Sequence, residues 1–284
     1  MLRRFFLASL FSHRRRWLCG LFSAVFTLTV ALGSIQPAKA ISWIELLLRG
    51  AQVIQLSSIS ERQEIQIGSE INQQLIDSGQ AKIYRGAAIN NYVNRIGQEM
   101  AKKSDRPNLP YTFQVVDDDG INAFATMGGY VYINTGLMER AENEAELASV
   151  IGHEIGHIVG RHSIKQLRQR AIAQGVLSAA GLERSQAVQI GVELAVNRQN
   201  SRSDELEADR FGLDNLRDSG YAPEGMVSFM KKLLENSSSV PTFISTHPAT
   251  SERIRLLQSR IPEGSANQGK GLDQRAYRNQ IRSL

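Results

Sequence analysis

The sequence has 284 residues, of which 42% are hydrophobic and 21% are charged. This composition is typical of a globular chain of one or two domains and excludes disordered, collagenous and multi-span membrane proteins. The formal net charge is +5, but the first 40 residues carry six of the 33 basic side chains and none of the 28 acidic ones, which leaves 27 basic against 28 acidic groups in the rest. We therefore predict no nucleic-acid partner.

Residues 1–40 have the layout of an export signal. Basic residues precede an apolar run of 19 residues (17–35), and Ala38 and Ala40 form a small-x-small site. We predict a signal peptide cleaved after Ala40; a retained N-terminal anchor near a membrane is the alternative, because the run is just long enough to span a bilayer. In both cases, we expect the chain after residue 40 to be exported to the periplasm or an equivalent lumen. The single cysteine, Cys19, lies in the run, so a metal in the mature chain must be bound by His, Asp or Glu.

Helices flank one short segment of alternating pattern in the mature chain. We expect helices over 43–56, over 61–78 with Ser60 as N-cap, and over 88–103. Two prolines then end the helical pattern, and about three strands are expected over 111–116, 123–126 and 130–134. Helices resume over 137–141, 143–160, 162–180, 185–199, 203–219, 223–235 and 249–260.

These elements predict an α+β, mostly helical domain with a small β-sheet ahead of the later helices. We place this domain at residues 41–261. The segment 262–284 has few apolar residues at its start, and we expect it to be a flexible tail.

Residues 153–157 read His-Glu-Ile-Gly-His inside the expected helix 143–160. Because positions i and i+4 lie on one helix face, His153 and His157 can bind one ion. Glu154 lies beside the first ligand, where it can reach a metal-bound water without binding the metal. The ion would lower the pKa of that water toward about 7, and Glu154 would take and then deliver the proton as catalytic base.

Three glycines also interrupt this helix, at positions 152, 156 and 160. Each costs about 1 kcal/mol of helix propensity relative to alanine, which is tolerable where another backbone or a substrate comes close. A solvated helix face with two incidental histidines does not explain this composition. The pattern therefore favours a metal site.

A catalytic zinc needs a third protein ligand and one open position. The segment 201–209 begins with a capping serine and continues as an amphipathic helix. Glu205 and Asp209 are four residues apart, so we predict Glu205 as the third metal ligand and Asp209 as the carboxylate that orients a ligating histidine; ordinary surface acids are the alternative. Glu207 lies on another face, where a solvated ion pair with Arg210 is the simplest reading.

The motifs at 153–157 (HExxH) and 201–209 (SRxxExxAD) together resemble those of the HtpX-like and CAAX-prenyl-protease-like zinc metallopeptidases, in particular their soluble, exported, BepA-like members. Two further matches support the resemblance: the glycine-containing strand segment 122–137 ahead of the metal helix, and Ser-Thr-His-Pro at 245–248 with Glu-Arg at 252–253. No 34-residue periodicity follows, so we expect a member without the C-terminal helical repeats.

The resemblance implies a zincin-type domain with one Zn²⁺ per chain, bound by the two motif histidines and Glu205, with Glu154 as catalytic base. It also implies that His247 approaches the metal, either as a gate over the open position or as a stabiliser of the tetrahedral intermediate, with Arg253 nearby. From the residues alone, His247 is a loop histidine before a proline.

We thus predict an exported zinc metalloendopeptidase with polypeptide substrates, and the resemblance suggests misfolded or misassembled cell-envelope proteins. The alternative is a chaperone-like envelope protein, whose latched metal site binds unfolded segments more than it cuts them. A structural zinc protein would have four protein ligands and no open position, and it gives no reason for an acid at position 154. If 130–134 is an edge strand, extended substrate can add to it by main-chain hydrogen bonds. Residues 161–200 could form a lid between the two ligand helices.

Overall fold

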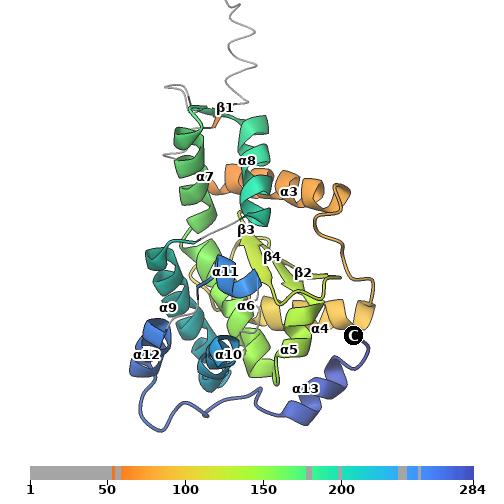
Figure 1. Ribbon diagram of the computed structural model, residues 1–284, viewed down its shortest axis with the longest axis vertical. Coiled ribbons are helices and arrows are strands. Elements are labelled where there is room, and N and C mark those ends of the chain that lie inside the picture. Colours follow the sequence, from red (N-terminus) through yellow and green to blue (C-terminus); the bar gives the residue numbers. More distant parts are fainter. Residues whose placement is uncertain (1–52, 55–58, 177–180, 198–199, 236–241, 249–250) are drawn as a thin grey trace, which may run out of the picture. The chain divides into compact units, whose positions relative to one another are not determined.

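The computed structural model describes residues 53–54, 59–176, 181–197, 200–235, 242–248 and 251–284 (Figure 1). All of them belong to one unit of the chain, which begins at Gln52. The predicted signal peptide and most of the predicted helix 43–56 lie outside the described residues. Where that helix was expected to end, Val53–Ile54 forms strand β1 instead. None of the helices that the structure describes combines the length and the apolar character that crossing a bilayer requires.

The helices predicted over 61–78 and 88–103 are confirmed. Helix α3 (Glu61–Asp77) begins at Ser60, whose hydroxyl accepts a hydrogen bond from the Gln63 amide while the Gln63 side chain accepts one from the Ser60 amide. This reciprocal cap satisfies two backbone donors that the helix cannot satisfy itself. Helix α4 (Ala87–Ala101) buries an apolar stripe at helical spacing, made of Ile89, Val93, Ile96 and Met100.

The three predicted strands form one mixed sheet. Strand β4 (Tyr130–Asn134) lies between β2 (Thr112–Val116), to which it is parallel, and β3 (Ala123–Thr126), to which it is antiparallel. The condition for strand addition at 130–134, that this strand lies at a sheet edge, is therefore not met. The edge strands are β2 and β3, and neither pairs with a further strand among the described residues. A single sequence shows strand positions, but pairing order depends on contacts between distant segments.

The helix that carries the HExxH motif is α6 (Glu144–Val159), which follows the short α5 (Thr135–Arg140). The Asn143 side chain caps α6 by accepting a hydrogen bond from the Glu146 amide at 3.0 Å. Its described residues from 145 to 158 are all buried. A helix that is buried on every side needs partners all round, and α6 contacts the sheet, α4, α7, α9 and α10 (Figure 1).

Helix α9 (Arg202–Asp218) packs against α6 along most of its length. Glycines permit a close approach of the two backbones. A Cβ atom built on Gly156 would lie 2.6 Å from the Ala208 carbonyl oxygen, and one built on Gly212 would lie 2.9 Å from the His153 amide nitrogen. The glycine cost predicted for this helix is thus offset by a close helix–helix contact.

The remaining elements surround this pair: α7 (His162–Ala173), β5 (Leu182–Glu183), α8 (Arg184–Val196), α10 (Glu224–Glu235), α11 (Thr242–Thr246) and α12 (Ser251–Arg260). Helix α7 packs on α8, α8 packs on α3, and β5 pairs with β1. The helix predicted over 162–180 ends early, because Gly175 has φ of +68° and cannot continue a right-handed helix. Strands β1 and β5 and the helix α11 were not predicted.

The tail predicted to be flexible is instead packed against the domain. Within 262–284, helix α13 (Gln274–Gln280) buries Tyr277, whose hydroxyl donates a hydrogen bond to the Met138 carbonyl oxygen at 2.6 Å. Ile281 is buried beside the same core. Two apolar side chains at helical spacing therefore anchor a segment whose composition is otherwise polar.

Backbone hydrogen bonds also hold the segment before α13. The Lys270 amide donates to the Gly220 carbonyl, the Ala222 amide donates to the Lys270 carbonyl, and the Ala145 amide donates to the Gly271 carbonyl, at 2.9–3.1 Å. These bonds join the tail to the start of α6 and to the turn after α9. A composition argument does not reveal them, because every residue type carries the same backbone groups.

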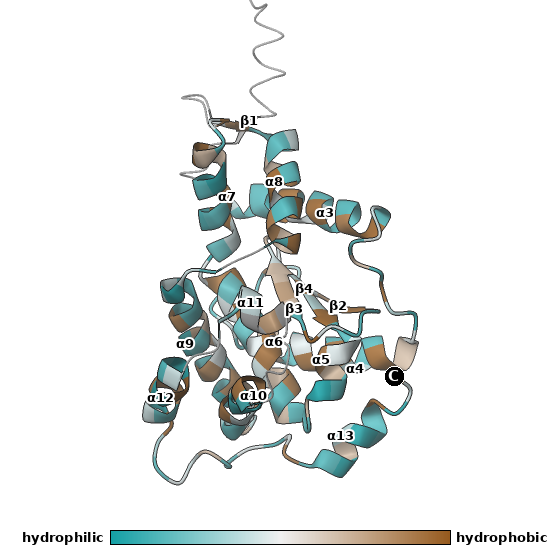
Figure 2. Ribbon diagram, viewed as in Figure 1, coloured by the Kyte–Doolittle hydropathy of each residue, from teal (hydrophilic) through white to brown (hydrophobic). Residues whose placement is uncertain are grey.

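Buried apolar side chains form two clusters. The larger joins α4, the sheet, α5, α6, α10 and α13, and the smaller joins α3, α7, α8 and the Tyr132 face of the sheet. Most of the surrounding helices carry both hydrophilic and hydrophobic residues (Figure 2), as expected for helices that bury one face. The confirmed architecture is α+β and mostly helical.

Candidate metal centre

Four buried side chains converge on one point: His153 and His157 from α6, Glu205 from α9 and His247 from the residue after α11. One ligand atom from each lies within 4.8 Å of the others. The two α6 imidazoles approach through Nε2 atoms 3.1 Å apart, and Glu205 oxygens lie 3.4 Å from His153 Nε2 and 3.3 Å from His157 Nε2. His247 Nδ1 lies 3.0 Å from Glu205 Oε1.

Local structure explains this convergence. The i, i+4 spacing puts both histidines on the face of α6 that meets α9. The Ser201 hydroxyl caps α9 by accepting a hydrogen bond from the Asp204 amide at 3.2 Å, so Glu205 stands in the first turn. The close α6–α9 contact then brings Glu205 to the two imidazoles.

Glu154 is fully buried, and neither of its carboxylate oxygens has a hydrogen-bond partner among the described residues. Its Oε1 lies 3.5 Å from His247 Nε2, which has no hydrogen-bond partner either. A buried carboxylate without donors costs free energy unless a cation or a donor faces it. Imidazoles, a carboxylate and an unpaired acid around one point fit a divalent cation with nitrogen and oxygen ligands, of the kind that Zn²⁺ prefers.

A buried salt bridge lies behind the ligand set. The His153 Nδ1 atom is 3.0 Å from Asp209 Oδ1, and Arg253 donates from Nε and Nη2 to the two Asp209 oxygens at 2.7 Å each. Arg253 Nη1 also lies 2.8 Å from Glu205 Oε2 and donates to the Pro248 carbonyl at 2.8 Å. One guanidinium thus links both predicted carboxylates to the segment that carries His247.

The charges of this cluster shift the pKa values of its members. Burial opposes the charged form of His153, but hydrogen bonds with Asp209 and Glu205 outweigh it and raise the pKa to about 9. Burial likewise opposes the ionised carboxyls, yet His247 and the α6 histidines hold the pKa of Glu205 well below its usual value, and Arg253 and His153 lower that of Asp209. Both carboxyls are therefore ionised and can balance a cation.

Comparison with known proteins identifies the family. The family model for peptidase family M48 matches residues 87–261. The chain belongs to peptidase family M48. The matched residues include both ligand helices, the sheet and the segment with His247.

Several curated relatives align with most of the chain. The beta-barrel assembly-enhancing protease of Escherichia coli K12 is 30% identical over 254 residues, which is 84% of this chain and 51% of that protein. The metalloproteases LoiP and YcaL of the same organism are 31% and 29% identical and cover 76% and 67% of this chain, and 87% and 80% of their own lengths. The chain spans about half the length of the first of these relatives.

Two polar residues of this M48 site were missed by the sequence analysis. His162 at the start of α7 is buried, and its Nδ1 lies 2.8 Å from Nδ1 of His157, on the side away from the cluster. Its Nε2 lies 3.2 Å from Glu207 Oε2. The predicted solvated pair of Glu207 with Arg210 is present, at 4.0 Å, and Glu207 in addition contacts this buried imidazole.

Asn200 is the second missed residue. Its Nδ2 lies 3.0 Å from His247 Nδ1 and 3.4 Å from His157 Nε2, and its Oδ1 accepts a hydrogen bond from Gln166 at 2.8 Å. Asn200 precedes the Ser201 cap of α9, a position that the motif could have drawn attention to. A lone amide before a helix start is nevertheless a common loop residue.

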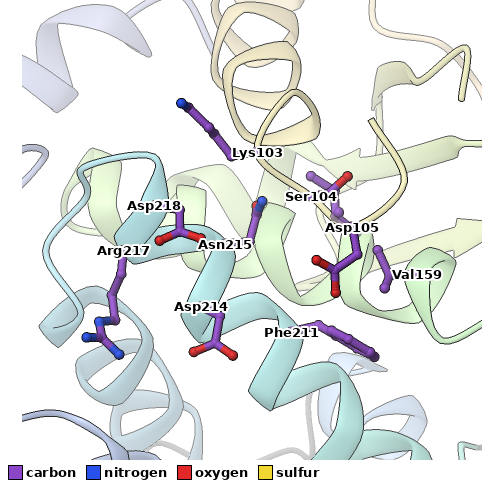
Figure 3. A pocket seen from close by; sticks show the side chains of 10 residues that line it. Lys103, Ser104, Asp105, Val159, Phe211, Asp214, Asn215, Arg217 and Asp218 are labelled. Carbon is purple, nitrogen blue, oxygen red and sulfur yellow. The ribbon is translucent and has the colours of Figure 1, made fainter. Parts of the chain in front are cut away.

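A cavity of about 370 Å³ lies away from the metal cluster, between the segment after α4 and the C-terminal half of α9. Figure 3 shows Lys103 and Asp105 on one side of it and Asp214 and Asp218 on α9. No member of the metal cluster lines this cavity. Its charged residues at the surface are typical of a solvated groove, so the chemistry of the chain is assigned to the buried cluster.

Proposed function

We propose that this M48 chain is an exported zinc endopeptidase that hydrolyses peptide bonds of misfolded or misassembled cell-envelope proteins. The observation that carries the proposal is the buried set of two imidazoles and a carboxylate beside a glutamate whose oxygens have no hydrogen-bond partner among the described residues. The names of the relatives, a beta-barrel assembly-enhancing protease and two metalloproteases, support a proteolytic role in the envelope. They do not favour the chaperone-like alternative.

In the proposed site, His153, His157 and Glu205 hold one Zn²⁺. When bound, the ion supplies Lewis-acid chemistry, in that it acidifies water and polarises a peptide carbonyl. Glu154 accepts the proton of the attacking water and delivers it to the leaving amine, because it stands next to the ligands and neither of its oxygens is engaged in a hydrogen bond within the described residues. Burial of the Glu154 carboxylate excludes bulk water, so its proton is not lost to solvent during the transfer.

Three further residues have supporting roles in this proposal. The Asp209 carboxylate, whose Oδ1 lies 3.0 Å from His153 Nδ1, keeps Nε2 of this imidazole directed at the ion. His247 lies in the same cluster and 3.5 Å from Glu154, so it would act either as a gate over the open metal position or as a donor to the developing oxyanion. Arg253 fixes Asp209 and Glu205 and touches the His247 segment.

Export is part of the same proposal. Residues 1–40 act as a signal peptide or as an anchor that keeps the domain near a membrane, and the catalytic domain spans 41–261 with 262–284 docked on it. Periplasmic location follows from the signal layout and agrees with the envelope role in the first relative's name. N-terminal sequencing of the chain from a periplasmic fraction should give Ile41 as the first residue; a chain confined to the cytosol would contradict export.

The proteolytic role is tested with zinc-loaded full-length chain and an unfolded probe, reduced casein. We expect cleavage that a chelator abolishes and zinc restores. Glu154→Gln should keep the metal and lose at least about 100-fold in turnover, the low end of general-base contributions. Asp77→Asn, an exposed acid at the end of α3, is the matched control and should cleave normally. Near-normal cleavage by Glu154→Gln would remove this carboxylate from the mechanism.

A further inference from the structure

The cavity between the segment after α4 and the C-terminal half of α9 has the size of a ligand site. Its volume of about 370 Å³ falls within the range of roughly 300–1,000 Å³ that pockets for small molecules occupy. Part of its wall is apolar: Ile155 and Val159 contribute from α6, and Phe211 contributes from α9. The cavity thus lies at the contact between the two helices that carry the metal ligands.

Three carboxylates line another part of this cavity. Asp105, Asp214 and Asp218 are exposed, and none of them takes part in an ion pair or a side-chain hydrogen bond within the ranges that the structure describes. Lys103 and Arg217 also border the cavity, but Figure 3 shows their side chains extending away from Asp105. With three acids against two bases, the lining carries a net negative charge and favours a cation.

A buried amide in the same wall has one atom without a partner. Asn215 is only 5% exposed, and its Nδ2 donates a hydrogen bond to the Met100 carbonyl at 2.8 Å. This bond fixes the orientation of the amide, because a carbonyl accepts only from the nitrogen end. The Oδ1 atom is buried and accepts no hydrogen bond from the described residues. Figure 3 places Asn215 between Asp218 and Asp105, so a donor bound in the cavity would offset the cost of leaving this oxygen unpaired.

The spacing of the acids favours an extended cation over a metal ion. In the candidate metal centre one ligand atom from each residue lies within 4.8 Å of the others, whereas the carboxylates of this cavity do not converge in that way within the described part of the chain. A single ion also fills only a small part of 370 Å³. A cation with several donors on an alkyl stem can instead reach separated acceptors and pack its stem on the apolar wall.

We propose that this cavity binds the arginine side chain of another polypeptide. A guanidinium presents several donors in a planar fork, so it can serve Asn215 Oδ1 and a carboxylate at the same time. Its hydrogen bonds to carboxylates are strengthened by charge, and its aliphatic stem packs on the apolar wall. A lysine ammonium is a compact, strongly hydrated point charge and reaches fewer of these acceptors.

This site is separate from the metal centre. The described residues that line the cavity include none of the four that form the metal cluster. An arginine docked here contacts both α6 and α9 and leaves the metal position open. Binding at this cavity needs no catalysis, so it is tested independently of the proposed proteolysis.

The test titrates three probes into the zinc-loaded full-length chain at low salt and follows binding by saturation-transfer NMR. The probes are acetyl-Gly-Arg-Gly-amide, the same peptide with citrulline in place of arginine, and spermidine, a free cation without a guanidinium. Citrulline keeps the shape of arginine and removes its charge. We therefore expect the arginine peptide to bind at least about tenfold tighter than the citrulline peptide, the size of one charge-assisted hydrogen bond. Spermidine should bind more weakly than the arginine peptide.

Two variants assign this binding to the cavity. Asp105→Asn and Asp214→Asn should each weaken binding of the arginine peptide several-fold, because each removes a charged acceptor. Both acids are exposed, so the variants should fold, and urea unfolding checks this. The matched control is Asp77→Asn, which neutralises an exposed acid of α3 outside the cavity and should bind as the wild type does.

Four results would overturn the arginine site. These are no binding of the arginine peptide, equal affinity for the arginine and citrulline peptides, spermidine binding as tightly as the arginine peptide, and affinity in Asp105→Asn and Asp214→Asn that matches that of Asp77→Asn. None of them bears on casein cleavage, so the proposed function and this site fail separately.

Discussion

At the scale of single residues, His162 explains how His157 is held. An imidazole that binds a metal through Nε2 carries its proton on Nδ1, and here that atom faces Nδ1 of His162 at 2.8 Å. His162 must then accept at Nδ1 and carry its own proton on Nε2, which faces Glu207 at 3.2 Å. A chain of hydrogen bonds thus runs from the surface carboxylate to the ligand and fixes its ring.

Replacing His162 should weaken metal binding. Phenylalanine in His162→Phe fills the space but cannot accept the hydrogen bond from His157, so we expect zinc affinity to fall roughly 10- to 100-fold. His162→Gln retains an acceptor oxygen and should lose less. Competition with a chromophoric chelator measures both affinities at one pH. Equal zinc affinity for the wild type and His162→Phe would contradict the role of this imidazole.

The convergence of the candidate ligands could be predicted from the sequence, whereas the contacts of His162 and Asn200 with them could not. Spacing inside one helix places the α6 histidines, and it places Glu205 and Asp209 on one face of α9. His162 instead reaches His157 through a turn at Arg161, which adopts φ of 53°, the left-handed region that a non-glycine residue seldom enters. Long-range bonds hold that turn: Arg161 donates to the Ile59 carbonyl at 2.7 Å.

At the scale of elements, the distance between α6 and α9 decides whether the ligands meet. The close contact between Gly156 and Ala208 leaves no space for a Cβ atom, and Ala208 meets it with backbone atoms that cannot rotate away. His153 and His157 flank Gly156 on the same helix, and Glu205 precedes Ala208 by three residues. A wider gap would therefore separate the carboxylate from the imidazoles.

Gly156→Ala should accordingly reduce both stability and metal affinity. Overpacking of this kind costs about 1–3 kcal/mol of the free energy of unfolding. Gly191→Ala in α8 is the control, because its Cβ would meet only the flexible side chain of Ile71, away from the ligands. Urea unfolding and zinc titration separate the two effects. If Gly156→Ala lost stability but bound zinc as tightly as Gly191→Ala, helix spacing would not set the site.

Elements with strong periodicity were predictable, and their partners were not. The bounds of α4, α6 and α9 follow the predicted ranges within two residues, because caps and apolar stripes act locally. The position of β4 in the centre of the sheet had no local signal. Helix α11 was also missed, since its five residues carry too little pattern to distinguish it from a loop.

At the scale of the whole molecule, the C-terminal segment completes the fold. Helix α13 places Tyr277 in the larger core, and the Gly271 carbonyl accepts a backbone hydrogen bond from Ala145 at the start of α6. The same end of α6 is fixed by Glu146, which accepts a hydrogen bond from Lys232 of α10 at 2.7 Å. The metal helix is therefore held at its N-terminal end by parts of the chain that lie far beyond the ligands in sequence.

Tyr277 tests this anchoring. Tyr277→Ala removes a fully buried ring and should cost about 3–5 kcal/mol of unfolding free energy, as large aromatic truncations do. Tyr277→Phe removes only the hydrogen bond to Met138 and should cost about 1 kcal/mol. Urea denaturation of both variants gives these values. A loss below about 0.5 kcal/mol for Tyr277→Ala would restore the flexible tail that the composition predicts.

The account as a whole depends on one cation held by His153, His157 and Glu205. Anomalous diffraction from crystals of the full-length chain, grown with one equivalent of zinc, tests this most directly. We predict one strong peak per chain, roughly 2.0–2.2 Å from the Nε2 atoms of the two histidines and from a Glu205 oxygen. A peak bound only by other residues, or no peak at this position, would contradict the account.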